Sequence, residues 1–317
     1  MHTFFLKRLL MSILTLILVS LFAFSIMQIL PGDPVRLALG EAVSEEKVQE
    51  YREAFGLNDP FFVQYYNWVK NIITRWDFGK SIMTGESITE LIAKRLPITF
   101  SLGLPAFVLG VALGMFLGVV SAVKRGGVVD NIVSFFANLS LGVPQFWIAI
   151  VGVYILSLKL EWIPLQGYVS PADDLAGFIS HAIWPVFCIS TFIFAVIARQ
   201  TRSNMLEAIQ QDYVRTARAN GIKNSSIIMK HTLKNALIPV VTIIGVQMRM
   251  LVCGSIIIES VFNIPGLGNL LLRGVTSRDY FIVQACVLLI SIVTVLANFL
   301  VDLAYGFLDP RVRKSWR

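Results

Sequence analysis

Apolar residues gather in six long runs along the chain, and shorter polar segments separate them. The runs cover Leu9–Leu30, Ile98–Val123, Ile132–Leu158, Ala182–Ala198, Ala236–Ile258 and Phe281–Val301. A helix that crosses the hydrocarbon core of a bilayer needs about 17 to 25 residues, each rising about 1.5 Å. The pattern therefore predicts an all-α, polytopic membrane protein with six transmembrane helices.

A polar and basic segment, 205–235, lies between the fourth and fifth runs. Apolar positions recur in it every three or four residues, at Leu206, Ile209, Tyr213 and Ala217, which predicts an amphipathic helix over Met205–Ala219. Asn220-Gly221 signals the end of that helix, and Asn224 or Ser225 can cap a second short helix. A basic helix, turn and helix fits a docking surface for another protein. It fits equally well a loop whose charge only fixes the topology.

The segment 31–97 is the one sizeable insertion between the apolar runs on the side of the membrane opposite to 205–235. Ser44 signals a helix start and Gly56 a stop. The aromatic and aliphatic residues that follow have helical spacing, so this helix should lie on another protein surface or on lipid headgroups. Ser87–Glu90 form a capping box that opens a short helix into the second run. We expect a small helical cap, too short to be a catalytic domain.

The first run, within 1–30, has a basic start like that of a signal peptide. Its apolar part is about twice as long as in such a peptide, and no A-x-A-like cleavage site follows it. We expect a retained transmembrane helix. The chain then divides into this N-terminal region, the cap at 31–97 and a core at 98–317 with five transmembrane helices.

Composition and charge support a membrane topology. Hydrophobic residues make up 56% of the chain and charged residues 15%, whereas soluble domains carry about a quarter charged residues. The termini, the loop 124–130 and the segment 199–235 together carry fifteen Lys and Arg against five acidic residues. By the positive-inside rule both termini and 205–235 face the cytoplasm. The basic charge then reflects topology, and no nucleic-acid partner is needed to explain it.

No catalytic motif emerges from the sequence. Gly-Lys-Ser at 79–81 ends like a phosphate-binding loop, but Thr74 stands where that loop needs glycine. The chain has no H-E-x-x-H and no G-x-S-x-G, and the three cysteines have no metal-binding or disulfide spacing. A membrane-embedded serine hydrolase built on Ser140 and His181 has no support from spacing. Any energy-requiring process of this chain must therefore draw its energy from a partner protein or from a gradient across the membrane.

Polar residues inside the apolar runs are the remaining candidates for a functional role. Arg249 lies deep in the fifth run with Gln247 nearby, and a charge there should face protein or water. Arg249 either borders a polar pathway or pairs with a carboxylate or carbonyl groups of a neighbouring subunit. Asn138, Gln145 and Gln284 fit hydrogen bonds across helices, although Gln145 is also a candidate for the pathway.

The segment Asp212–Gly221 resembles the cytoplasmic coupling loop of permeases of ABC importers, in the form typical of the dipeptide, oligopeptide and nickel branch. The acidic residue and the first alanine of the general Glu-Ala-Ala pattern are replaced here by Arg215 and Thr216. Other segments are similar to that branch: LPGDP, FGLNDPFFVQYYNW, DFGKS, RLPITFSL, GVPQFW, ESVFNIPGLGNLLLRGVTSRDY and DPRVRK. The ordered set covers nearly the whole chain.

The resemblance implies a type I ABC importer permease fold and a role for each segment. The coupling loop would dock on a cytoplasmic ATPase through Tyr213, Arg215, Thr216, Ala217, Arg218, Gly221, Lys230 and Asn235. A translocation path would involve Gln247, Arg249 and Gln145. The cap and the segment 259–280 would lie beneath a binding protein, through Glu259, Pro265, Gly266, Gly268, Arg278 and Asp279.

The implied assembly contains a second, similar permease, two ATPase subunits, an extracytoplasmic binding protein and the lipid bilayer of a cell membrane. This chain would be a transport subunit and not an enzyme, with no metal or cofactor of its own, because ATP and Mg bind the partners. The expected substrate is a di- or oligopeptide, ahead of a nickel chelate or glutathione. A gradient-driven secondary transporter is the alternative, but the paired intramembrane carboxylates that it would need are missing.

Overall fold

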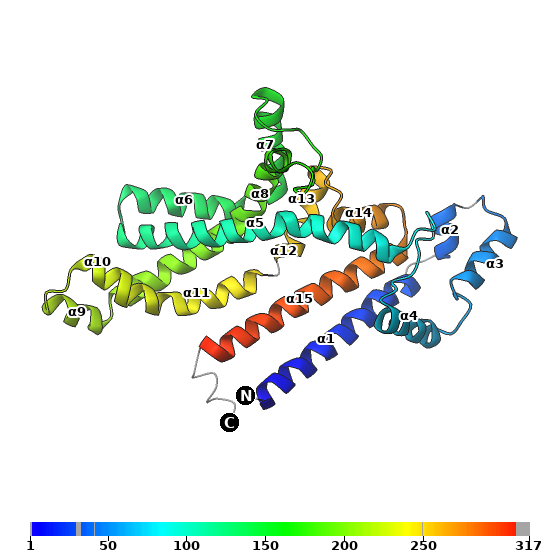
Figure 1. The fold of residues 1–317 in the computed structure, drawn as a ribbon, viewed down its shortest axis with the longest axis horizontal. Helices are drawn as coiled ribbons and strands as arrows, with labels where there is room; N and C mark the ends of the chain where they lie inside the picture. The colour runs from blue at the N-terminus through cyan, green and yellow to red at the C-terminus, as the bar shows by residue number, and fades with distance from the viewer. Residues whose placement is uncertain (1, 30–32, 41, 249, 309–317) are drawn as a thin grey trace.

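The computed structural model describes residues 2–29, 33–40, 42–248 and 250–308. Figure 1 shows the long helices α5, α6, α8 and α11 packed together, with α1 and α15 side by side and antiparallel next to them. The described residues are helical apart from turns, loops and one isolated bridge between Lys80 and Ser87. An all-α architecture is therefore confirmed.

The four longest helices each coincide with one of the apolar runs, and two of them, α5 and α8, extend well beyond theirs. They are α1 (His2–Ile29), α5 (Ile88–Val123), α8 (Leu175–Ile209) and α15 (Tyr280–Leu308). Among the described residues, five helical stretches are long and apolar enough to cross a membrane, or six if one bent pair counts as a single span. The cytoplasmic position of both termini stays a prediction.

The third run, expected as one transmembrane span over Ile132–Leu158, is bent in the structure, and its crossing of the membrane as a single span stays a prediction. It forms α6 (Val128–Gly142) and then α7 (Gln145–Gly152), which continues as the π-helix η1 (Val153–Lys159), and the two parts meet at 103°. Pro144 lies between them. Proline has no N–H to continue the hydrogen-bond ladder of α6, which accounts for the break.

The fifth run is also broken, so the predicted span over Ala236–Ile258 is wrong beyond Gln247. The chain forms α11 (Leu233–Gln247), the short α12 (Met250–Cys253) and α13 (Ile256–Val261), and then α14 (Leu267–Thr276). The break between α12 and α13 falls at Gly254-Ser255, and the break between α13 and α14 contains Pro265-Gly266. Small residues and proline thus mark these changes in direction.

A row of glycines brings α5 and α8 into close contact. Gly110, Gly114 and Gly118 recur every four residues on one face of α5, and an added Cβ at each would lie 2.7–2.8 Å from Ile193, Ile197 or Ala198 of α8. Only glycine fits at such distances. This small-residue packing is the kind that joins helices in membranes.

The cap contains α2 (Pro34–Leu39), α3 (Glu45–Ala54) and α4 (Phe61–Arg75). Ser44 precedes α3 and Gly56 follows it with φ +64°, as the sequence predicts. Ser87 accepts a hydrogen bond from the backbone N of Glu90 at 3.5 Å. The helix that it caps is α5 itself, so the expected short helix and the second span are one helix. The expected boundary between residues 97 and 98 lies inside it.

Candidate functional site

The basic segment between α8 and α11 forms two short helices at one end of the molecule. Figure 1 shows α9 (Asp212–Ala219) and α10 (Asn224–Ser226) at one end of the long axis, and the cap helices at the other. The π-helix η2 (Ile227–Thr232) joins α10 to α11. The prediction of one helix over Met205–Ala219 is wrong, because α8 ends at Ile209 and α9 begins after a two-residue break.

Gly221 makes the turn between these two helices. Its φ is +74°, a conformation that glycine adopts without the steric cost of a Cβ. The backbone N of Gly221 bonds to the carbonyl of Arg218 at 3.0 Å, and that of Ile222 bonds to Ala217 at 3.2 Å. This is the Schellman pattern of a helix end. The predicted turn is confirmed, whereas Lys223 and not Asn224 or Ser225 occupies the cap position of α10.

Buried side chains fix α9 and η2 on the ends of the long helices. Val214 and Ile227 are each 1% exposed, and Met205 of α8 is fully buried. The sequence pattern placed Tyr213 on the apolar face, but Tyr213 is exposed and its neighbour Val214 is the buried residue. The helix break before α9 shifts the register of the pattern, which explains the difference.

The predicted docking residues form an accessible surface with three basic side chains and no acidic one, which we call the coupling surface. Tyr213, Arg215, Thr216, Arg218, Gly221, Lys230 and Asn235 are exposed and Ala217 is half-buried. Arg218 and Val214 also line a groove of about 230 Å³ between α9, η2 and the loop end of α5. Such a surface can dock on another protein. It contains no arrangement of groups that suggests catalysis.

An ion pair ties the helix ends near the coupling surface together. The carboxylate of Asp130, at the start of α6, accepts hydrogen bonds from Arg202 of α8 at 2.6 and 2.8 Å. It also accepts bonds from the hydroxyl of Ser121 at 2.5 Å and the backbone N of Gly126 at 2.9 Å. The sequence analysis did not identify this pair, because its members are 72 positions apart.

A second polar network lies between α5, α13 and α14. Glu259 is fully buried, and its carboxylate accepts hydrogen bonds from Thr99 at 2.7 Å, Ser255 at 2.9 Å and the backbone N of Asn269 at 3.1 Å. Thr99 in turn accepts a bond from the backbone N of Leu267 at 2.8 Å. Burial raises the pKa of the Glu259 carboxyl. The hydrogen bonds to the carboxylate offset this effect only in part, so the pKa stays above its ordinary value.

Asp279 joins the cap to the start of α15. Its side chain is fully buried, and one carboxylate oxygen accepts a hydrogen bond from Ser81 at 2.5 Å. The other oxygen accepts a weaker bond from the backbone N of Ile282 at 3.4 Å. Asp279 therefore fixes the loop that precedes α5 against the first turn of α15.

Four of the six residues expected to face a binding protein are buried. Glu259, Gly266, Gly268 and Asp279 lie inside the protein, whereas Pro265 and Arg278 are exposed. Contact of this segment with a binding protein stays a prediction, and of the six residues only Pro265 and Arg278 offer an exposed side chain in this conformation. Gly266 and Gly268 leave room for the Glu259 carboxylate, which would lie 2.4 and 3.0 Å from a Cβ at these positions. Their role is to hold the network together.

Two of the three candidate residues for a translocation path, Gln145 and Gln247, lie among the described residues. Gln145 donates a hydrogen bond to the carbonyl of Ile189 on α8 at 3.3 Å, which is the cross-helix contact that the sequence suggested. Gln247 is 3% exposed, and its amide nitrogen has no partner among the described residues. Arg249 lies outside the described residues. A path through these residues stays a prediction.

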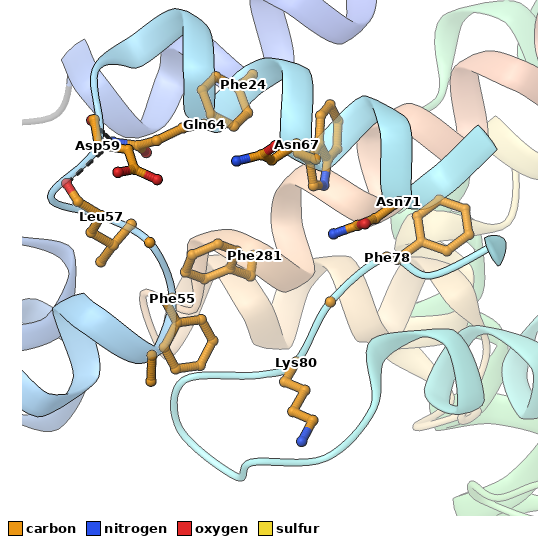
Figure 2. Close-up of a pocket in the computed structure, with 14 residues that line it drawn as sticks. Phe24, Phe55, Leu57, Asp59, Gln64, Asn67, Asn71, Phe78, Lys80 and Phe281 are labelled. Atoms are coloured by element: carbon orange, nitrogen blue, oxygen red, sulfur yellow. Dashed lines mark hydrogen bonds between the residues drawn. The ribbon is translucent and has the colours of Figure 1, made fainter. Parts of the chain in front are cut away.

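A pocket of about 390 Å³ opens in the cap, and the sequence analysis did not anticipate it. Figure 2 shows Gln64, Asn67 and Asn71 on one edge of α4, with Phe55, Phe281 and Lys80 across the cavity. None of the predicted site residues lines it. No short motif marks this pocket, because its walls come from α1, α3, α4, α15 and two loops.

Two family models together match almost the whole chain. The model for the binding-protein-dependent transport system inner membrane component matches residues 110–314, and the corresponding N-terminal model matches residues 1–103. The chain is also similar to a methionine ABC transporter in an inward-facing conformation, with a TM-score of 0.54, 19% identity, and coverage of 70% of this chain and 98% of the other. That likeness supports the fold alone.

Curated relatives match over their full length. A probable peptide ABC transporter permease of Sinorhizobium fredii is 38% identical, covering 99% of this chain and 100% of the relative. An oligopeptide transport system permease of Bacillus subtilis is 36% identical over 98% and 99%. A glutathione transport system permease of Pectobacterium atrosepticum is 40% identical over 99% of both. The chain therefore belongs to the family of binding-protein-dependent transport system inner membrane components.

Proposed function

We propose that this chain is the permease subunit of an ATP-driven ABC importer and forms half of a translocation channel for di- or oligopeptides. The observation that carries the proposal is the basic, glycine-turned coupling surface at the end opposite the cap, in a member of this transport family. In this assignment the coupling surface and both termini face the cytoplasm, in agreement with the excess of Lys and Arg there.

The chain would contribute no reaction chemistry. Two ATPase subunits would bind ATP and Mg and hydrolyse the nucleotide, and a second permease would complete the channel. Movement of an ATPase would pull on α9, and the ends of α5, α6 and α8 would follow because Val214, Ile227 and the Asp130–Arg202 pair connect them. The result is a coupling of binding free energies between nucleotide and substrate through rigid helices.

A peptide is the substrate class that the relatives favour. Relatives are named for peptide, oligopeptide, dipeptide and glutathione transport, and glutathione is itself built from amino acids. A nickel chelate stays a weaker alternative within the same branch. A binding protein would deliver the substrate at the cap end, where Pro265 and Arg278 are exposed.

Co-purification from native membranes tests the proposal. The tagged chain should bring down a second permease and ATPase subunits, which mass spectrometry identifies. A chain that purifies alone, or only with copies of itself, would contradict the proposal and favour a gradient-driven transporter. Uptake of a labelled dipeptide into right-side-out vesicles should also stop when the ATP inside them is depleted, whereas uptake driven by an ion gradient alone would count against the proposal.

A further inference from the structure

Helix α4 of the cap carries an exposed apolar edge that no described part of the chain covers. Phe62 and Ile73 are each 76% exposed, Tyr66 is 63% exposed, and Trp76 at the end of the helix is 58% exposed. These residues recur at intervals of three, four and seven positions, so they lie along one side of the helix. Large side chains in such a row are more than the scattered apolar residues of an ordinary protein surface.

The other two sides of α4 are already occupied. Phe61, Tyr65 and Trp68 face α1, where their rings lie 5.3, 5.5 and 5.6 Å from the ring of Phe24. Asn67 and Asn71 lie on the side of the pocket (Figure 2). At about 100° per residue, the edge with Phe62 and Ile73 lies nearly opposite the pocket side. The exposed edge is therefore a separate surface.

The contact with α1 fixes the depth of α4 along the membrane span. The hydroxyl groups of Tyr65 and Ser20 lie 2.8 Å apart, and Phe24 packs against the same face of α4. The apolar stretch of α1 that can cross a bilayer is Leu6–Ser25. Helix α4 thus packs on the last two turns of that stretch, where the hydrocarbon core gives way to the headgroups.

The chemistry of the edge suits that depth. Tyrosine and tryptophan are enriched at the interface between hydrocarbon and headgroups, and basic residues beside them reach the phosphates. Lys70 lies 5.9 Å above the ring of Tyr66, next to the apolar edge. Leu18 and Phe22 of α1 are also exposed, so the span presents apolar side chains at the height of its contact with α4.

We propose that α4 is an interfacial anchor, which lies on the bilayer with Phe62, Tyr66, Ile73 and Trp76 in the boundary between headgroups and acyl chains. The partner is the lipid surface itself. Held in this way, α4 would set the height and tilt of the cap over the helix bundle. The inference does not depend on the substrate or on the identity of the ATPase partners.

Site-directed fluorescence quenching tests the anchor. The exposed Cys253 is first replaced by serine so that it does not react with the probe, whereas Cys188 and Cys286 are buried and can stay. An environment-sensitive nitrobenzoxadiazole probe is then attached to a cysteine introduced as Ile73→Cys or Tyr66→Cys. Asn71→Cys is the matched control, because it is exposed on the same helix but on the pocket side. The complete complex is reconstituted in phosphatidylcholine–phosphatidylglycerol nanodiscs, with and without lipids that carry a nitroxide near the headgroup.

Nitroxide lipids should quench the fluorescence of the probe at positions 73 and 66 and leave the fluorescence of the probe at position 71 unchanged. Equal quenching at all three positions would overturn the proposal, because the edge would then have no special relation to lipid. A probe at position 73 that emits as in an apolar environment but is not quenched would also overturn it. That result would mean that another subunit covers the edge.

Discussion

Arg202 holds the carboxylate of Asp130 with two parallel hydrogen bonds, from Nε to Oδ1 at 2.6 Å and from Nη2 to Oδ2 at 2.8 Å. The pair joins α6 to α8, seven residues before α8 ends at Ile209. Asp130 is 3% exposed, so its charge depends on this partner. Two-point contacts of this kind fix orientation as well as distance. The coupling surface is thus attached to helix ends that this ion pair holds together.

Replacing Arg202 with alanine should destabilise the protein, because it leaves a buried carboxylate unpaired. Breaking a buried pair typically costs about 3–5 kcal/mol, and the partial exposure of Arg202 places the expected loss near the lower end of that range. Arg202→Lys should be intermediate, because lysine cannot form the two parallel bonds. Thermal denaturation of the purified complex measures the loss. Arg199→Ala, at an exposed position on the same helix, should have little effect, and equal stability of the two variants would contradict this role.

Gly221→Val should abolish coupling without blocking membrane insertion. The glycine has φ +74°, and no atom lies within 4 Å of an added Cβ, so the effect comes from backbone strain and not from a clash. The left-handed conformation costs about 1–2 kcal/mol for a residue with a side chain. Dipeptide uptake and stimulated ATPase activity should fall sharply while the amount of protein in the membrane stays normal. Gly221→Asn should keep most activity, since asparagine tolerates this conformation, and normal uptake by the valine variant would remove the turn from the mechanism.

Glu259→Ala should cost more stability than Glu259→Gln. Alanine leaves the donors of Thr99, Ser255 and Asn269 without an acceptor and opens a cavity. Glutamine keeps the shape and one acceptor, and the raised pKa of Glu259 means that the site already disfavours the charge. Denaturation temperatures of the three proteins check the order. A glutamine variant as unstable as the alanine variant would show that the charge itself is required.

Gly114→Leu should separate α5 from α8. An added Cβ at this position would lie 2.7 Å from Ile197, and a larger side chain has no room at all. We expect loss of folded protein from the membrane, because the two longest helices of the core can no longer approach. Gly142→Leu is the matched control, since nothing lies within 4 Å of a Cβ there. Protein yield after mild detergent extraction distinguishes the two, and similar yields would argue against the glycine contact.

Much of the fold could be predicted from local patterns. Hydropathy located the long helices, and the Asn220-Gly221 signal located the turn of the coupling segment, because each depends on residues close in sequence. The bend at Pro144 was visible as a proline, but its 103° angle depends on how α7 packs on α8. The row Gly110, Gly114 and Gly118 was also readable in the sequence. It was missed because its partner helix lies about 80 residues away.

The errors at the candidate site have a common physical cause. The family resemblance of their segment implies that Glu259 and Asp279 face a binding protein, but both are buried, and their partners Thr99 and Ser81 are 160 and 198 positions away. The helix break after Ile209 shifts the register of α9, so Val214 is buried and Tyr213 is exposed. Contacts distant in sequence decide all of these positions, and one sequence does not reveal them.

Photocrosslinking from the coupling surface shows whether α9 docks on an ATPase subunit. A photoreactive phenylalanine analogue replaces Arg215, which is exposed on α9, and a control places it at Asn67 in the cap. Illumination of native membranes should link position 215 to an ATPase subunit, and position 67 should give no such product. An intact complex in which position 215 never reaches an ATPase, or in which position 67 does, would contradict the assignment of α9 as the coupling element.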